Sequence, residues 1–369
     1  MKSNYKQLGE YIEIVSRVNS DLKYGIDDVR GCSNTKKMMQ TRANLIGRTY
    51  EKFIVLKPQE FVFNRRTTRN GEKIGMAYND TDREYIFTND YVAFRVKKEC
   101  LSELLPEYLY LFFCRDEFDR YARYKSTGSA TEFFNWEDMC AVPLEVPSFD
   151  FQKKMVKAYR IINEQIENKK KIDDILQAQA YAIYKYIIAD YEKNASLSDI
   201  ADITMGTSPE GESLNDCGIG IVFYQGKTDF GFRYPSVRLY TTNPKRFADR
   251  NDILMSVRAP VGDINIAQED CAIGRGLAAI KPKDGCRSYL FYTMMELNAE
   301  LKKFNDEGTV FGSITKDDLS ALQVVDATEE VRRCFEKKVE PIDKVIFNNE
   351  TEIKKLLEMR SLILSQLNN

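Results

Sequence analysis

The chain has 369 residues and a mass of 42.7 kDa, which is too long for one compact core and predicts two or three. Hydrophobic residues make up 43% and charged residues 30%, a globular composition, and no apolar run approaches the roughly 20 residues of a membrane span. The formal net charge of −2 argues against a protein that coats nucleic acid through bulk electrostatics.

The residue types needed for several common catalytic sites are missing. The sequence contains no histidine, which excludes Ser-His-Asp and Cys-His catalysis and every histidine-ligated metal site. The eight cysteines are dispersed without a Cys-x-x-Cys pair, so we interpret them as reduced thiols and expect neither a metal nor a cofactor. Because the N-terminal segment lacks the apolar stretch of a secretory signal, we expect a cytoplasmic protein that does not enter the membrane.

Residues 1–147 are predicted to form a first module of mixed strands and helices. The stretch 36–73 carries ten basic and three acidic side chains, a local excess suited to following a phosphate backbone. After an apolar strand that begins at Phe61, a polar loop offers arginines that can grip phosphate or guanine and an asparagine that can pair with adenine. A solvated basic hairpin is the alternative interpretation. The candidate DNA contacts in this loop are Asn64, Arg65, Arg66, Arg69 and Lys73.

Two segments, 148–193 and 328–369, are predicted to be long helices. Apolar residues follow strict 4-3 spacing from Met155 to Ile187 and from Phe335 to Leu367, the pattern of helices that pair along a coiled-coil seam. Each seam has a polar break near its middle, at Lys169 and at Asn349. Such a residue commonly fixes the register of the pair, and a frayed or hydrated point is the alternative.

The second helix contains Pro341. Its ring removes a backbone hydrogen bond and disfavours helix at the residue before it. We therefore expect Pro341 either to kink the helix or to mark its true start.

Residues 194–327 are predicted to form a second module with two glycine-containing strands, at 253–267 and 271–280. The glycines allow another backbone to approach closely, and hydrogen-bonding side chains sit beside the turns. The candidate DNA contacts are Gln225, Lys227, Arg258 and Arg275. This module holds 14 basic and 19 acidic residues, a net charge of −5, so we expect any basic contact face to be narrow.

The chain also contains an internal repeat. The segment 8–14 corresponds in outline to 197–203, and the segment 128–139 corresponds to 308–319. Each copy leads into one of the long helices, so the chain is predicted to be a tandem of module, helix, module and helix.

The sequence contains no complete motif for nucleotide binding, methyl transfer or nuclease activity. Residues 226–228 resemble the end of a phosphate-binding loop, but the required glycine is replaced by Ile221. We find no methyltransferase motif, because Asn243-Pro244 is followed by lysine. The acidic residues form no pattern of a magnesium-dependent nuclease. We therefore predict a protein without catalytic activity of its own.

Residues 252–267 and 271–280, together with 223–231 and 311–319, make the sequence resemble the DNA specificity subunits of type I restriction-modification systems. The resemblance covers essentially the whole chain, and residues 129–139 give a looser version of the element that precedes the helix.

The resemblance implies an α+β fold with two target-recognition domains, separated by an antiparallel pair of long helices with pseudo-two-fold symmetry. Each domain then reads one half of a bipartite, asymmetric site on double-stranded DNA. It also implies that the helices dock two DNA adenine methyltransferase subunits, to which restriction nuclease and translocase subunits can attach. The alternative function is a coiled-coil scaffold without DNA readout.

Overall fold

The computed structural model describes residues 6–41, 45, 47–67, 73–128, 131–305 and 312–368. The chain divides into two units. Unit 1 comprises Met1–Gln165 and Leu356–Asn369, and unit 2 comprises Ile166–Lys355. Two long helices, α4 (Phe149–Ile188) and α9 (Glu329–Ser365), contribute residues to both units.

Unit 1 contains a four-stranded antiparallel sheet in the order β2-β9-β6-β7 and three two-stranded pairs, β1-β10, β3-β4 and β5-β8. Its strands are β1 (Lys6–Gln7), β2 (Ile12–Val15), β3 (Arg30–Cys32), β4 (Met38–Gln40), β5 (Ile54–Leu56), β6 (Phe61–Asn64), β7 (Met76–Tyr78), β8 (Tyr85–Phe87), β9 (Tyr91–Val96) and β10 (Pro143–Leu144). Its short helices are α1 (Pro106–Phe113), α2 (Asp116–Lys125) and α3 (Trp136–Cys140).

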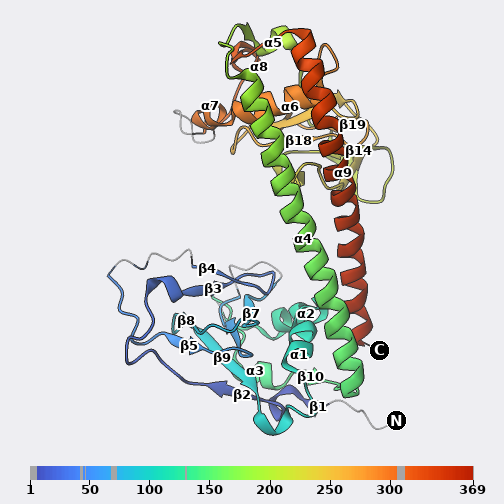
Figure 1. Ribbon diagram of the computed structural model, residues 1–369. Coiled ribbons are helices and arrows are strands. Elements are labelled where there is room, and N and C mark those ends of the chain that lie inside the picture. Colours follow the sequence, from blue (N-terminus) through green and yellow to red (C-terminus); the bar gives the residue numbers. More distant parts are fainter. Residues whose placement is uncertain are drawn as a thin grey trace. The chain divides into compact units, whose positions relative to one another are not determined.

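An aromatic cluster forms the main core of unit 1. The Phe61 ring lies 5.0 Å from Phe94 of the neighbouring strand and 5.7 Å from Phe113 of α1. The same core includes Met155 of α4, and Ile363 of α9 packs against it. The sheet, the short helices and this part of the helix pair therefore share one hydrophobic core. Figure 1 shows α1 and α2 next to α4.

Unit 2 contains two larger sheets. An antiparallel sheet has the order β12-β20-β17-β18, and a mixed sheet has the order β13-β15-β14-β19-β16, in which β14 and β19 are parallel. The strands are β11 (Ala195–Ser196), β12 (Ala201–Met205), β13 (Leu214–Asn215), β14 (Ile221–Tyr224), β15 (Leu239–Thr241), β16 (Phe247–Ala248), β17 (Ile253–Ser256), β18 (Ile264–Ile266), β19 (Cys271–Ile273), β20 (Leu277–Pro282) and β21 (Gln323–Val324). The short helices are α5 (Leu197–Ile200), α6 (Arg287–Glu296), α7 (Asn298–Lys303) and α8 (Lys316–Ala321).

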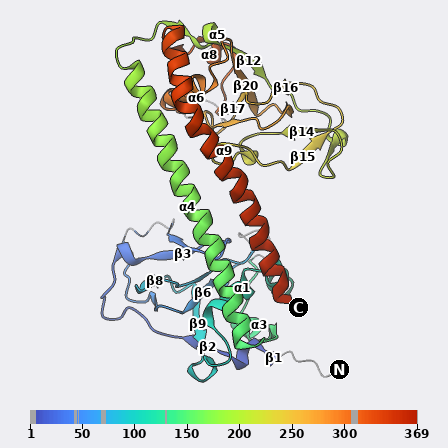
Figure 2. The ribbon, with the colours of Figure 1, turned by 45° about the vertical axis from the view of Figure 1, so that its right-hand side comes forward.

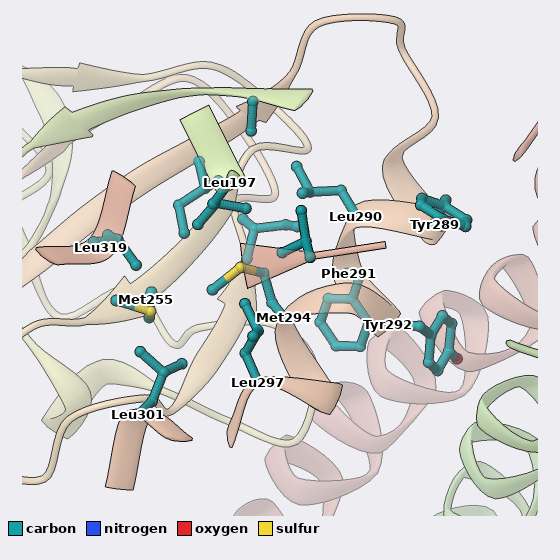
Figure 3. Close-up of a cluster of buried hydrophobic side chains, with 14 of the residues drawn as sticks. Leu197, Met255, Tyr289, Leu290, Phe291, Tyr292, Met294, Leu297, Leu301 and Leu319 are labelled. Atoms are coloured by element: carbon teal, nitrogen blue, oxygen red, sulfur yellow. The ribbon is translucent and has the colours of Figure 1, made fainter. Parts of the chain in front are cut away.

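The largest core of unit 2 lies between the antiparallel sheet and α6. Figure 3 shows Met255 of β17 close to Met294 and Leu297, with Leu197 and Leu319 from α5 and α8 in the same cluster. This core continues into the helix pair, because the Tyr184 ring of α4 lies 5.8 Å from the Phe335 ring of α9 and both are fully buried. The two strands predicted at 253–267 and 271–280 are each two strands in the structure. A turn at Gly262 separates β17 from β18, and a turn at Gly274 separates β19 from β20.

The helices α4 and α9 pair in an antiparallel sense in each unit. In unit 2, Tyr184 contacts Phe335 and Lys169 contacts Glu352, so the partner's number rises as the residue number on α4 falls. Figure 2 shows the two helices side by side. The predicted seam is confirmed, since the buried residues of α9 are Phe335, Val339, Ile346, Asn349 and Ile353. The pseudo-two-fold symmetry concerns the relation between the two units, and it stays a prediction.

The polar break in the seam is a largely buried hydrogen-bonded network within unit 2. The Lys169 ammonium donates to the Asn349 side-chain oxygen over 3.2 Å, and the Asn349 amide donates to Asp173 over 2.7 Å. Asn349 is 8% exposed and Asp173 is 1% exposed, while the Lys169 side chain is 24% exposed and pairs with Glu352, so the break is hydrogen-bonded rather than frayed. Pro341 lies inside α9, which begins at Glu329, so it does not mark the start of the helix.

The topology of unit 2 brings three strand ends to one place. Because β14 and β19 are parallel, with Tyr224 beside Ile273, the residues that follow both strands emerge at the same edge. The antiparallel pairing of Ser256 with Leu277 then brings the end of β17 to the start of β20. A Cβ atom at Gly276 would lie 2.7 Å from the Gln225 carbonyl oxygen, so the close approach of these backbones requires glycine.

We expect Ile346→Ala to lower the free energy of unfolding by about 2–4 kcal/mol, because it removes a fully buried seam side chain and leaves a cavity. The control is Ile175→Ala on α4, a side chain that is 67% exposed and whose loss should change stability by less than about 0.5 kcal/mol. Urea denaturation followed by circular dichroism measures both. Equal effects would contradict the seam.

We expect Gly276→Ala to destabilise the protein by about 1–3 kcal/mol, because the new methyl group overlaps the Gln225 carbonyl. Gly226→Ala is the matched control, since a Cβ atom there meets no atom within 4 Å and its backbone is extended. Thermal unfolding of the two variants compares them directly. A tolerated alanine at Gly276 would show that the strand ends are not held so closely together.

Candidate nucleic-acid interface

An open cleft of about 440 Å³ lies where the strand ends of unit 2 converge. Its walls come from the segment after β14, from the turn after β17 and from the turn before β20. The residues that line it are Gly226, Lys227, Thr228, Arg258, Ala259, Pro260 and Gly276. The structure therefore brings together parts of the chain that lie far apart in the sequence.

Backbone hydrogen bonds hold the walls of this cleft together. The Val257 N–H donates to the Gly276 carbonyl over 3.0 Å, and the Gly274 N–H donates to the Tyr224 carbonyl over 2.8 Å. On the outer side, the Ala259 N–H donates to the Gly312 carbonyl over 2.9 Å. The turns that carry the candidate side chains are thus tied to both sheets, and the side chains project from a fixed frame.

The four candidate residues of unit 2 all lie at or beside the cleft. Lys227 and Arg258 line it, while Gln225 and Arg275 belong to the two chain segments that Gly276 brings together. All four side chains are exposed. Lys227 forms an ion pair with Asp263. Within the described ranges, the guanidinium groups of Arg258 and Arg275 have no carboxylate partner.

Unpaired and exposed arginines at a cleft are available to an external acceptor. A guanidinium group offers five donors in a planar fork that matches a phosphate or the edge of guanine. Asp229, which is 3% exposed, accepts from the Gln225 N–H over 2.8 Å and pairs with Arg238. This buried carboxylate shapes the segment that carries Gln225 and Lys227. It was missed in the sequence because an isolated aspartate in a loop carries no distinguishing pattern.

Sequence reasoning also missed Thr228, which lines the cleft, and Ser208, whose hydroxyl accepts from the Arg275 N–H over 3.3 Å. Gly226 and Gly276 belong to the same surface. The glycines in 274–276 were the one available signal, because they indicated a close backbone approach.

The candidate residues of unit 1 are arranged differently. Arg66 pairs with Asp90 over 3.2 Å and Lys73 pairs with Asp116 over 3.1 Å, while Arg65 lies over the Phe133 ring at 5.9 Å. The Asn64 side-chain oxygen accepts from the Arg66 N–H over 3.0 Å and so shapes the turn. Arg69 lies outside the described residues.

Acidic residues from outside the stretch 36–73 compensate part of its basic charge. Lys36 is 4% exposed and pairs with Asp119, and Lys57 pairs with Glu84. Burial lowers the pKa of Lys36 and raises the pKa of Asp119, and each group opposes the shift of the other. The ammonium group of Lys36 also donates to the Ile74 carbonyl over 2.8 Å. It therefore anchors the end of the basic loop rather than facing an external phosphate.

The described part of the chain contains no cluster of three or more cysteine, aspartate or glutamate side chains that could hold a metal ion. Among the same residues, no helix combines the length and the apolar character that a membrane crossing needs.

Comparison with known proteins finds similar chains of one kind. Residues 188–325 match the family model of the type I restriction modification DNA specificity domain. The chain is 38% identical over 167 residues to the putative type I restriction enzyme MjaX specificity subunit of Methanocaldococcus jannaschii, an alignment that covers 45% of this chain and 39% of that protein. The chain thus spans about two fifths of the length of this relative.

Two further proteins align over more of the chain. The type I restriction enzyme MjaIX specificity subunit of the same organism is 21% identical over 300 residues, which are 72% of this chain and 68% of that protein. The crystal structure of the type I restriction-modification system S subunit from M. genitalium has a TM-score of 0.58 at 12% identity, covering 98% of this chain and 95% of that one. This structure shows the same fold. Residues 188–325 thus carry the match to the DNA specificity domain, and the rest of the chain is similar to specificity subunits of type I restriction enzymes at low identity.

Proposed function

We propose that this chain reads a split sequence in double-stranded DNA, with unit 1 reading one half and unit 2 the other, and that it performs no reaction itself. The observation that carries the proposal is the cleft of unit 2, which Arg258 lines and Arg275 flanks, both exposed and, among the described residues, without a carboxylate partner. The family model matched at residues 188–325 covers this cleft. A scaffold without DNA readout is not favoured, because it has no use for such a surface.

In this proposal Gln225, Lys227, Arg258 and Arg275 contact one half-site. Guanidinium groups supply bidentate donors, and the amide of Gln225 supplies both a donor and an acceptor for a base edge. In unit 1 the contacts come from Asn64, Arg65, Arg66, Arg69 and Lys73. Phosphate binding there has to displace the surface ion pairs of Arg66 and Lys73, which costs little because exposed pairs are weak.

We also propose that α4 and α9 dock two DNA adenine methyltransferase subunits, to which restriction nuclease and translocase subunits can attach. One face of α4 within unit 2 supports this docking. Ile172, Ile175 and Tyr186 are 46%, 67% and 84% exposed, and the helical period places all three on one side of the helix. An exposed apolar stripe on a long helix is typical of a protein interface.

The test of DNA readout is co-expression of the full chain with its cognate modification methyltransferase, followed by mapping of adenine methylation across a genome. The expected result is a two-part motif with two different halves. We expect Arg258→Ala to relax the base preference in one half only and to weaken binding of the target duplex by about tenfold, because one specific contact is worth about 1–3 kcal/mol.

Arg287→Ala is the control for this experiment, because Arg287 is an exposed arginine of unit 2 that does not line the cleft. It should leave the motif unchanged. A motif that stays intact in Arg258→Ala would remove the cleft from the readout, and methylation without any split motif would overturn the proposed function.

The docking proposal predicts that Ile175→Asp weakens association with the methyltransferase by about tenfold or more, because it places a charge in a buried apolar contact. Thermal stability of the free chain should not change, since Ile175 is 67% exposed. Asp174→Lys, on another face of α4, is the control. Sedimentation velocity of mixtures measures the association, and unaltered complex formation by Ile175→Asp would exclude this face as the docking site.

A further inference from the structure

Arg233 is a fully buried arginine in the segment that joins β14 to β15, with 0% of its surface exposed. One terminal nitrogen donates to Asp343 of α9 over 2.7 Å. The other donates to Gln177 of α4 and to the Tyr292 hydroxyl of α6, each over 3.0 Å. One guanidinium group therefore connects a surface segment of unit 2 to three helices.

Further contacts hold this arrangement, although the Nε atom of Arg233 has no hydrogen-bond partner among the described residues. The guanidinium carbon lies 4.3 Å from the centre of the Phe291 ring, and the second oxygen of Asp343 accepts from the Ser288 hydroxyl over 2.6 Å. The Arg233 carbonyl accepts from the Ile266 N–H over 2.9 Å. Both the side chain and the backbone of Arg233 are thus held.

The segment held in this way forms one wall of the cleft. Gly226, Lys227 and Thr228 of this segment line the cleft, and Arg233 follows shortly after them in the chain. Between them, Asp229 closes the segment on itself by accepting from the Gln225 N–H and pairing with Arg238. The Gly231 N–H donates to the Asn265 side-chain oxygen over 3.0 Å. Arg233 is therefore one direct connection from the helices to the cleft wall.

A buried ion pair contributes little net stability to a folded protein. Removing a guanidinium group and a carboxylate from water is costly, and well-packed apolar side chains in their place are often as stabilising or more so. What an apolar pair does not reproduce is the directed fork that bonds Asp343, Gln177 and Tyr292 at once. The geometry points to a role in placement rather than in stability.

We propose that Arg233 is the positioning residue for DNA readout by unit 2, which sets Gln225 and Lys227 in register with Arg258 across the cleft. This inference rests on the proposed function. Arg233 is fully buried and does not contact the DNA. It acts by tying the cleft wall to α4, α6 and α9.

The test compares Arg233→Met with the double variant R233M/D343L, each co-expressed with the methyltransferase. The half-site of unit 2 is first identified as the half that Arg258→Ala relaxes. We expect Arg233→Met to lower the preference for the correct bases in that half by about tenfold, the range of one lost base contact. The preference in the other half should change by less than about twofold, because unit 1 does not depend on this anchor.

The double variant separates placement from stability. It removes both charges and leaves an apolar pair, so it should recover the Tm that Arg233→Met loses while the relaxed half-site remains relaxed. If base preference returns together with Tm, Arg233 serves stability only and the inference is wrong. Equal relaxation of both halves would overturn it as well, because the effect would then not be local to unit 2.

Arg332→Met is the matched control. Arg332 is also a largely buried arginine of unit 2, which ties α9 to Asp284 over 2.7 Å and to Asp326. None of these residues lines the cleft. We expect this variant to lower Tm and to leave both halves of the motif intact. Absence of a split motif with the unmodified chain would contradict the proposed function itself, an outcome distinct from an unaltered motif in Arg233→Met.

Discussion

The antiparallel seam between α4 and α9 is the constraint on which the rest of the molecule depends. Tertiary packing of an apolar stripe, rather than helix propensity, supplies most of the stability of a protein helix such as the 40-residue α4. Tyr184 of α4 and Phe335 of α9 also belong to the largest hydrophobic core of unit 2. Met155 of α4 likewise belongs to the main hydrophobic core of unit 1. The helix pair therefore supplies part of the hydrophobic core of each module.

The positions of the ion pairs, more than the number of charges, determine which basic side chains are available to an external ligand. The basic stretch 36–73 is strongly positive in the sequence, yet Lys36, Lys57, Arg66 and Lys73 all pair with acidic residues that lie outside it. The second module has a net charge of −5 but presents at its cleft two arginines that have no carboxylate partner among the described residues. Where the acidic partners lie in three dimensions decides which cations are available to DNA.

The long-range architecture was predictable because its signal is periodic. The 4-3 spacing located both helices, and the repeat gave Lys169 and Asn349 equivalent positions in the two seams, where they bond to each other. Periodicity reports which face of an element is buried, so it was sufficient for the seam. The tandem order of modules followed from the repeat.

The cleft and its anchors were only partly predictable. The segments that carry Gln225 and Arg275 lie close together because β14 and β19 are parallel and adjacent. The pairing of strands that lie far apart in the chain leaves no periodic signal in one sequence. Arg233 and Lys36 were not recognised as buried for a related reason. An arginine or lysine is expected at the surface, and only the three-dimensional placement of Asp343 and Asp119 offsets the cost of burial.

The short strand pairs that close each module have a consequence for how such chains diversify. Lys6 pairs with Leu144 in unit 1, and Ala195 pairs with Val324 in unit 2, so the polypeptide enters and leaves each module at neighbouring points. A different module with the same two closing strands can replace the original one between these points, and the flanking helix still begins at the same residue. Exchange of a module by recombination then demands compatible packing only where the module contacts the helices, and the remainder of the inserted sequence is free to differ.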